Sequence, residues 1–195
     1  MQRKGADLEL PEGFDPQRDR VLLHCCCAPC SSAILEWMSL EAWQPGIFFS
    51  NSNIVPQAEY ELRREELKTY ARSYGWETFD DEYDHRAWLE AVKGLEHEPE
   101  RGARCAACFR FRLLRAARFA QENGYRLLTT TLASSRWKDL QQVDEAGRWA
   151  TAHFPDVIWW NRNWRKGGLQ ERRNRLIKER CMYNQTFCGC EFSHR

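Results

Sequence analysis

The sequence predicts an α/β fold with a doubly wound, mostly parallel sheet and helices on both faces. Short apolar segments alternate along the chain with longer segments of helix-forming residues, which is the pattern of repeated βαβ units. Of the 195 residues, 43% are hydrophobic and 13% aromatic, enough to build one buried core. We therefore expect a single α/β domain at residues 20–195, preceded by a flexible or loosely docked N-terminal arm at residues 1–19.

Five apolar segments are expected to form the strands of this sheet. The first, Val21–Cys25, is an apolar run with the length of a buried strand. The others are similarly short and lie at residues 46–50, 76–79, 126–130 and 156–160. Because parallel strands need long connections, the segments between these runs are expected to contain helices.

The first helix is expected at Ala33–Leu40, because Pro29, Ser31 and Ser32 before it are common turn residues. Further helices are expected at residues 57–74, 86–93, 106–123, 137–153 and 168–181. Glycine follows three of these segments directly, at Gly75, Gly94 and Gly124, and glycine is typical of a position just beyond a helix end.

Cysteine is the most informative residue type in this chain, which contains nine of them. Leaving Cys25 aside, seven lie in three short motifs: HCCCAPC at residues 24–30, CAAC at 105–108 and CGC at 188–190. Two cysteines separated by two residues can bind one metal from a turn or a helix start. Thiolates select zinc, copper(I) or iron-sulfur centres over hard ions, so the motifs predict a soft-metal site.

The expected compartment agrees with metal binding. The N-terminal residues contain no apolar run typical of a signal peptide, and no segment approaches the roughly 20 apolar residues of a membrane span. We therefore expect a cytoplasmic protein without a membrane partner. Thiols stay reduced in that compartment and remain available as ligands.

Two simpler interpretations of the cysteines remain open. A structural zinc site needs only four ligands, and thioredoxin-like dithiol exchange would use the CAPC sequence alone. The first motif follows the first strand, where open α/β sheets bind ligands, so a catalytic site is favoured. Cys25 is expected in the core, because adjacent strand residues point to opposite faces of a sheet.

The net charge of +1 hides two basic tracts. Residues 101–118 contain six arginines and no acidic residue, and residues 162–180 contain eight Lys or Arg residues. Trp159, Trp160 and Trp164 lie beside the second tract, where they can stack on bases or belong to the core. Such tracts suit contact with nucleic acid, whereas a solvated basic face is the simpler alternative.

Five segments together resemble the successive motifs of the QueH-type epoxyqueuosine reductases. They are LLHCCCAPCSS, FFSNSNIVPQAEYELRREEL, GLEHEPERGARCAACFRFRL, TTTLASSRWKDL and YNQTFCGCEFS, in this order between Leu22 and Ser193. The resemblance implies the last step of queuosine biosynthesis, in which the epoxide of epoxyqueuosine at the wobble position of tRNA is reduced to an alkene. It also implies a HUP-like (Rossmann-like) fold and independence from cobalamin.

The resemblance further implies a [4Fe-4S] cluster next to a second metal, iron. The partners it implies are tRNA carrying epoxyqueuosine in the anticodon and an electron donor that the sequence does not identify. It assigns the metal ligands to Cys26, Cys27, Cys30, Cys105, Cys108, Cys188 and Cys190. All of these except Cys30 are expected at the cofactor, and the division between the cluster and the second metal stays open.

The chemistry of epoxide reduction requires a proton donor to the leaving oxygen. The candidates for this catalytic role are His24, Tyr60, Arg63 and Lys138, each with a structural contact as the alternative. Substrate contacts are expected from Asn51, Asn53, Arg104, Arg112, Arg165, Lys166, Arg172 and Gln185. The chain departs from the family pattern at Arg136 and Trp137, where a Pro-His or similar pair is expected before the lysine.

Two other functions are considered. One is sulfur insertion into a tRNA base, which some HUP-fold enzymes perform; HCCCAPC replaces the Gly/Ser-rich ATP loop of those enzymes, which argues against it. The other is a zinc-stabilised RNA-binding module without catalytic activity.

Overall fold

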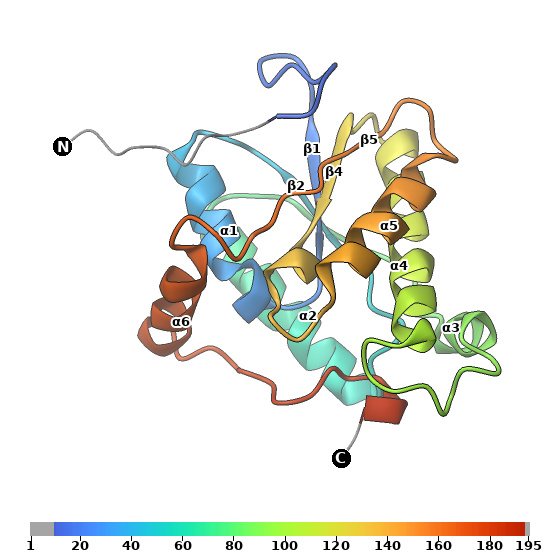
Figure 1. Cartoon of the computed structure of the whole chain (residues 1–195). Helices are drawn as coiled ribbons and strands as arrows, with labels where there is room; N and C mark the ends of the chain where they lie inside the picture. The colour runs from blue at the N-terminus through green and yellow to red at the C-terminus, as the bar shows by residue number, and fades with distance from the viewer. Residues whose placement is uncertain (1–9, 194–195) are drawn as a thin grey trace.

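Five parallel strands form the centre of the computed structural model, which describes residues 10–193 (Figure 1). The strands are β1 (Val21–Cys25), β2 (Gly46–Phe49), β3 (Thr78–Asp80), β4 (Leu127–Thr130) and β5 (Ile158–Trp159). Their order in the sheet is β3-β2-β1-β4-β5, and every neighbouring pair is parallel. The chain thus builds one half of the sheet outward from β1 and then the other half, which confirms the doubly wound prediction.

Helices cover both faces of the sheet, as the sequence predicts. The helices are α1 (Ala28–Leu40), α2 (Gln57–Arg72), α3 (His85–Ala91), α4 (Ala103–Glu122), α5 (Leu140–Thr151), α6 (Leu169–Glu179) and the short 3-10 turns η1 (Thr131–Ser134) and η2 (Glu191–Ser193). On one face α1 packs against α2 and α6, and on the other α4 packs against α5 and α3 (Figure 1). Both layers bury the apolar strands between them.

The first helix begins at Ala28, five residues before the predicted start at Ala33. Pro29 lies in its first turn, where the missing N–H of proline is not needed. The Ser31 hydroxyl donates a hydrogen bond to the Cys27 carbonyl (2.7 Å), a partner that a helix start provides. The predicted turn was wrong because these residues are also compatible with a first helical turn. Because α1 begins at Ala28, Cys27 lies at the N-cap of this helix.

Helix α4 begins at Ala103, before the CAAC motif, whereas the predicted start at residue 106 lies after the first cysteine of the motif. The Glu98 carboxylate accepts a hydrogen bond from the Ala103 N–H (3.1 Å) and so caps the new start. Cys105 and Cys108 therefore lie on helix α4, three residues apart on one face.

Helix α5 begins at Leu140, three residues after the predicted start at Trp137. The Asp139 carboxylate is the N-cap and accepts a hydrogen bond from the Gln141 N–H (2.8 Å). Trp137 and Lys138 consequently lie in the turn before the helix.

The predicted N-terminal arm lies partly outside the described residues, since the structure describes nothing before residue 10. Within the described part, Phe14 is buried and stacks on Trp43 with ring centroids 5.9 Å apart. The division into an arm and one domain stays a prediction. Among residues 10–193, no helix combines the length and the apolar character that a membrane span requires.

Helix α5 packs tightly against Trp159 of β5 at Gly147, where an added Cβ would overlap the indole ring. The Trp159 indole is held by a hydrogen bond from Nε1 to Asp144 Oδ1 (2.8 Å), so it cannot move away freely. We expect Gly147→Ala to lower the free energy of unfolding by about 1–3 kcal/mol, measured by urea denaturation. Arg148→Ala, exposed on the same helix, should change it by less than about 0.5 kcal/mol. Equal effects of the two substitutions would contradict this packing argument.

Candidate metal centre

The site lies at the carboxyl ends of the central strands. Cys26 follows β1, Asn51 follows β2 and Thr131 follows β4. The Cys26 N–H donates a hydrogen bond to Thr131 Oγ1 (3.0 Å), and the Thr131 hydroxyl donates in turn to Cys26 Sγ (3.4 Å). The Asn51 amide donates to the Cys25 carbonyl (2.9 Å). Backbone and side chains of three neighbouring strand ends thus hold the first cysteine motif in place.

Three thiols of this motif converge. The sulfur atoms of Cys26, Cys27 and Cys30 all lie within 4.8 Å of one another, and those of Cys26 and Cys27 are 3.8 Å apart. Hydrogen bonds from the Cys27 and Cys30 thiols hold the pKa of Cys26 well below its usual value. Burial raises the pKa of Cys27, and the hydrogen bond with Cys26 raises that of Cys30 to about 12. The triad thus favours one thiolate, the form that binds metal.

Three of the other four predicted ligands, Cys105, Cys108 and Cys188, lie near a lysine. Burial tends to raise the pKa of Cys188, but the Lys138 ammonium, which donates to Cys188 Sγ (2.8 Å), brings it below its usual value. Burial tends to lower the pKa of Lys138, but the neighbouring cysteines, Cys188 above all, raise it overall. Cys108 and Cys190 are buried together in a small hydrophobic cluster. Lys138 therefore remains protonated beside a thiolate.

Arg112 connects the two groups of cysteines. Its buried guanidinium donates hydrogen bonds to the Ser50 carbonyl (3.0 Å) and to Asn51 Oδ1. Its positive charge favours the thiolate forms of Cys26 and Cys188, which belong to different motifs. The first and last cysteine motifs therefore both interact with one buried cation. Lys138 in turn interacts with cysteines of both the last motif and the CAAC motif.

His24 is fully buried and both ring nitrogens have partners. Nε2 lies 3.0 Å from the Ser50 carbonyl, which can only accept, so Nε2 carries the hydrogen and Nδ1 accepts from the Thr130 hydroxyl (2.7 Å). Burial, aided by the charge of Arg112, lowers the pKa of His24 to about 3. The imidazole is therefore neutral near pH 7 and cross-links the strand ends.

Tyr60 and Arg63, on α2, also contact protein atoms. The Tyr60 hydroxyl donates to the Asp81 carbonyl (3.4 Å), and burial raises its pKa to about 12. The Arg63 guanidinium donates to the Glu59 carboxylate (2.7 Å) and to the Cys188 carbonyl (2.9 Å). An added Cβ at Gly189 would lie 3.0 Å from Arg63 Nη1, so glycine permits this close approach. Arg63 thus fixes the backbone of the CGC motif.

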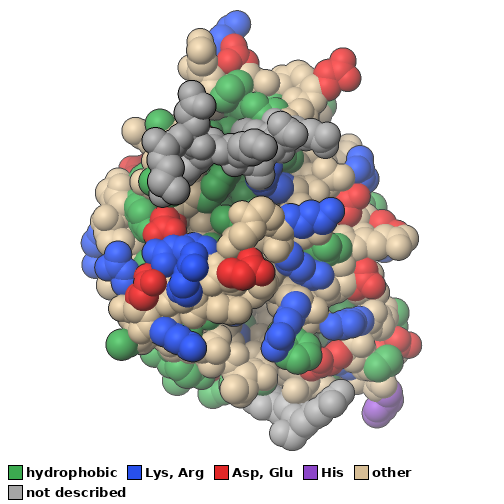
Figure 2. Space-filling model, turned by 60° about the vertical axis from the view of Figure 1, so that its left-hand side comes forward, with side chains coloured by type: hydrophobic (Ala, Val, Ile, Leu, Met, Phe, Trp, Pro, Cys, Tyr) green, Lys and Arg blue, Asp and Glu red, His purple; other side chains and the backbone are tan. Residues whose placement is uncertain are grey.

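The predicted tRNA contacts differ in their availability. Arg104 donates to the Glu96 carbonyl (2.7 Å), so its guanidinium is committed within the protein. Arg172 forms ion pairs with Glu36 (2.6 Å) and Glu179 (2.9 Å). Figure 2 shows the side of the molecule that carries α6, with Lys and Arg side chains in blue next to Asp and Glu side chains in red.

Arg165 and Lys166, two further predicted tRNA contacts, differ in whether their charged groups are available. Arg165 donates from Nη2 to the Ser135 and Lys138 carbonyls (2.7 Å to the latter), and Lys166 is exposed. Of the five predicted cationic contacts, Lys166 therefore has the side chain best placed for a phosphate.

Two predicted substrate residues carry unsatisfied carbonyl groups. Asn53 Oδ1 and Gln185 Oε1 are buried and have no hydrogen-bond partner among the described residues. A buried polar atom without a partner costs about 1–3 kcal/mol, and a bound ligand can remove that cost. Both amides are therefore suited to contact a polar substrate.

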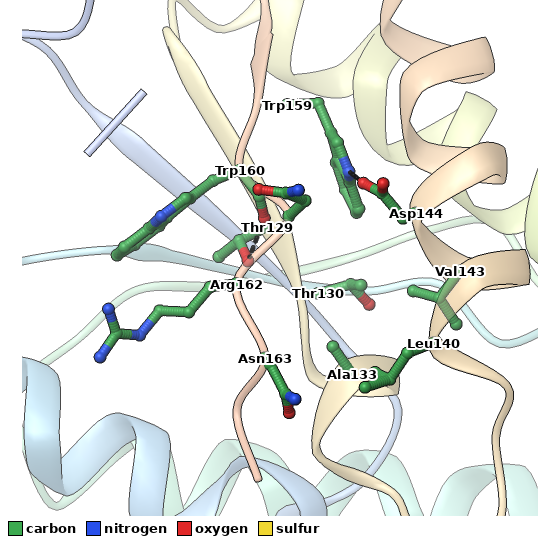
Figure 3. A pocket seen from close by; sticks show the side chains of 11 residues that line it. Thr129, Thr130, Ala133, Leu140, Val143, Asp144, Trp159, Trp160, Arg162 and Asn163 are labelled. Atoms are coloured by element: carbon green, nitrogen blue, oxygen red, sulfur yellow. Dashed lines mark hydrogen bonds between the residues drawn. The ribbon is translucent and has the colours of Figure 1, made fainter. Parts of the chain in front are cut away.

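The tryptophans beside the second basic tract belong to the core. Trp160 and Trp164 are 2% and 1% exposed, and the Trp164 indole donates to Thr129 Oγ1 (3.1 Å). A small cavity of about 50 Å³ lies next to Trp160, at the carboxyl ends of β4 and β5 (Figure 3). These two tryptophans consequently offer no exposed ring to an extruded base.

Two residues next to the cysteines, Thr131 and Trp88, were not predicted from the sequence. Thr131 hydrogen-bonds to Cys26, and its place at the end of a strand is a signal that could have found it. Trp88 packs with Cys108 and Cys190, and its buried indole N–H opposes the effect of burial, which raises the pKa of Cys108 to about 11. No local pattern marks Trp88, since its helix lies far from both motifs in sequence.

Comparisons with known proteins agree with the residues found here. The family model described as "Epoxyqueuosine reductase QueH" matches residues 21–195. The curated epoxyqueuosine reductase QueH of Histophilus somni is 42% identical over 188 residues, which cover 96% of this chain and 76% of that protein. The epoxyqueuosine reductase QueH of Acinetobacter baylyi is 40% identical over 195 residues, which cover 100% of this chain and 88% of that protein. The Thermotoga maritima protein of the same name is 36% identical over 177 residues, covering 89% of each chain.

Proposed function

Because this chain belongs to the family of QueH epoxyqueuosine reductases, we propose that its seven clustered cysteines hold a [4Fe-4S] cluster and a second metal, iron. The protein is an oxidoreductase of queuosine biosynthesis and reduces epoxyqueuosine at the wobble position of tRNA to queuosine. The observation that carries the cofactor proposal is the convergence of the Cys26, Cys27 and Cys30 thiols within 4.8 Å. The proposal also includes a cytoplasmic enzyme that takes its electrons from a separate donor.

The donor set fits the proposed groups. Iron-sulfur clusters are held by thiolates, and hydrogen bonds to their sulfur atoms tune the reduction potential. Trp88 Nε1 is a buried donor beside Cys108 and Cys190, suited to such a bond. When bound, the two groups would supply two electrons, one at a time, and a Lewis acid for the epoxide oxygen.

The reaction places a defined demand on the protein side chains. Reduction of an epoxide to an alkene breaks both carbon–oxygen bonds, takes up two electrons and two protons, and releases the oxygen as water. Lys138 is the best-placed donor for one of these protons, because its ammonium lies 2.8 Å from Cys188 Sγ and stays protonated there. We assign positioning roles to His24, Tyr60 and Arg63, whose polar atoms already bind protein partners.

Substrate recognition is assigned to the remaining polar groups. The unpaired carbonyls of Asn53 and Gln185 can accept hydrogen bonds from the modified base or its hydroxyls. Asn51 and Arg112 hold each other between the strand ends and orient this wall of the site. Lys166 is the proposed phosphate contact, and the other predicted contacts, Arg104, Arg165 and Arg172, support loops and helices from within.

The proposal is tested by anaerobic purification, a visible spectrum and analysis of iron and sulfide. We expect a brown protein with about five irons per chain that converts epoxyqueuosine-containing tRNA to queuosine when a strong reductant is supplied. A colourless zinc protein that stays inactive after iron-sulfur reconstitution would contradict the cofactor assignment. A requirement for ATP would instead favour sulfur insertion.

A further inference from the structure

An exposed tryptophan lies directly next to the candidate proton donor. Trp137 is 63% exposed, and the neighbouring Lys138 donates its hydrogen bond to Cys188 Sγ (2.8 Å). Consecutive Cα atoms are about 3.8 Å apart, so the indole is attached within one residue of the metal centre. Burial in the core therefore does not account for this large apolar side chain.

Two arginines hold the turn that carries Trp137. Arg101 donates from Nη2 to the Arg136 carbonyl and from Nε to the Trp137 carbonyl, both at 3.1 Å. Arg165 donates to the Ser135 and Lys138 carbonyls, so all four carbonyls of residues 135–138 accept from a guanidinium. Charge-assisted hydrogen bonds are about twice as strong as neutral ones. The turn consequently presents its tryptophan on a fixed backbone, although it lies at the surface.

The surroundings of the indole are cationic. The guanidinium carbon of Arg136 lies 4.8 Å from the centroid of the Trp137 ring, and Arg136 is itself exposed. Arg101 and Arg165, which bind the backbone of the turn, add two further positive charges next to it. A rigid aromatic ring beside cations is the arrangement by which proteins bind single-stranded RNA, because the ring stacks on a base and the cations attract phosphates.

We propose that Trp137, together with Arg136, is a stacking platform for an unpaired anticodon-loop base that flanks the base being reduced. The proposal rests on the proposed function, since the wobble base can react only when its loop is brought to the cysteines. A flanking base then lies near the turn that carries Lys138. The platform takes the role that the buried Trp160 and Trp164 cannot fill.

The test uses a synthetic anticodon stem-loop RNA with 2-aminopurine next to the wobble position, because stacking quenches the fluorescence of this base. We expect the wild-type protein to bind the RNA with quenching. Trp137→Leu should weaken binding by about 5- to 100-fold and abolish the quenching, since base–aromatic stacking contributes strongly to such affinities. Trp137→Phe keeps an aromatic ring, so its affinity and its quenching should lie between those of the wild type and Trp137→Leu.

Trp149→Leu is the matched control. Trp149 is 38% exposed and also has an arginine, Arg110, over its ring (5.7 Å). It lies nine residues after Leu140 on α5, about 14 Å further along the helix, so its replacement should leave binding and quenching unchanged. Equal binding and quenching by Trp137→Leu, Trp149→Leu and the wild type would overturn the platform.

The same proteins are also assayed for queuosine formation, so that the two proposals can fail separately. Trp137→Leu should raise KM for the tRNA and leave kcat at saturation nearly unchanged, because the platform binds a non-reacting base. If the wild type forms queuosine but Trp137→Leu has an unchanged KM, the platform is wrong and the function stands. If the wild type binds and quenches the RNA but forms no queuosine, the function is wrong.

Discussion

Replacing Cys26, Cys27 or Cys30 singly by serine is expected to remove iron from the protein and to lower its activity by more than 100-fold. The three thiols lie within 4.8 Å of one another, and a hydroxyl cannot replace a thiolate as ligand of an iron-sulfur centre. Changes to residues that only support metal ligands already cost about 10- to 100-fold, so loss of a ligand should cost more. Iron and sulfide analysis, the visible spectrum and the rate of queuosine formation measure the effect.

Cys181→Ser is the matched control for these substitutions. Cys181 is exposed and stands outside the three motifs, so the serine variant should keep its iron, its brown colour and its activity. A Cys26→Ser variant that retains full iron content and full activity would refute the role of the triad. Equal losses in the Cys181→Ser variant would show that the assay reports general thiol damage.

Replacing Lys138 by methionine is expected to lower kcat by about 100-fold or more without loss of iron. Methionine has a similar length but no ammonium, so the variant loses the proton next to Cys188 and keeps the packing. The pKa of the Cys188 thiol should also rise, because the Lys138 charge opposes the effect of burial. Single-turnover formation of queuosine under saturating tRNA measures the chemical step.

Two variants make the lysine experiment decisive. Lys138→Arg keeps the charge but changes the donor geometry, so its kcat should lie between those of the wild type and Lys138→Met. Lys93→Met replaces an exposed lysine on the surface and should behave as the wild type. An unchanged kcat in Lys138→Met would exclude the proton-donor role, whereas loss of iron in that variant would show that Lys138 supports the metal centre.

The positions of the strands and the starts of the helices depend on different kinds of information. Local composition predicted all five strands, and most clearly β1, β2 and β4, because a fully buried parallel strand must be a short apolar run. The predicted helix starts differed by three to five residues from the observed starts at Ala28, Ala103 and Leu140. At such boundaries a turn and a first helical turn accept the same residues, and a capping contact such as that of Glu98 decides between them.

The sequence by itself determined the order of the α/β elements, the family and the three cysteine motifs, since each of these follows from residue type and spacing along the chain. Only the tertiary structure decided which cations and aromatic rings are available. Arg63 meets the Cys188 carbonyl across 125 positions of sequence, and Trp164 is buried while Trp137 is exposed. Such pairings arise because folding brings distant segments into contact, and burial then sets the charge, the partners and the accessibility of each side chain.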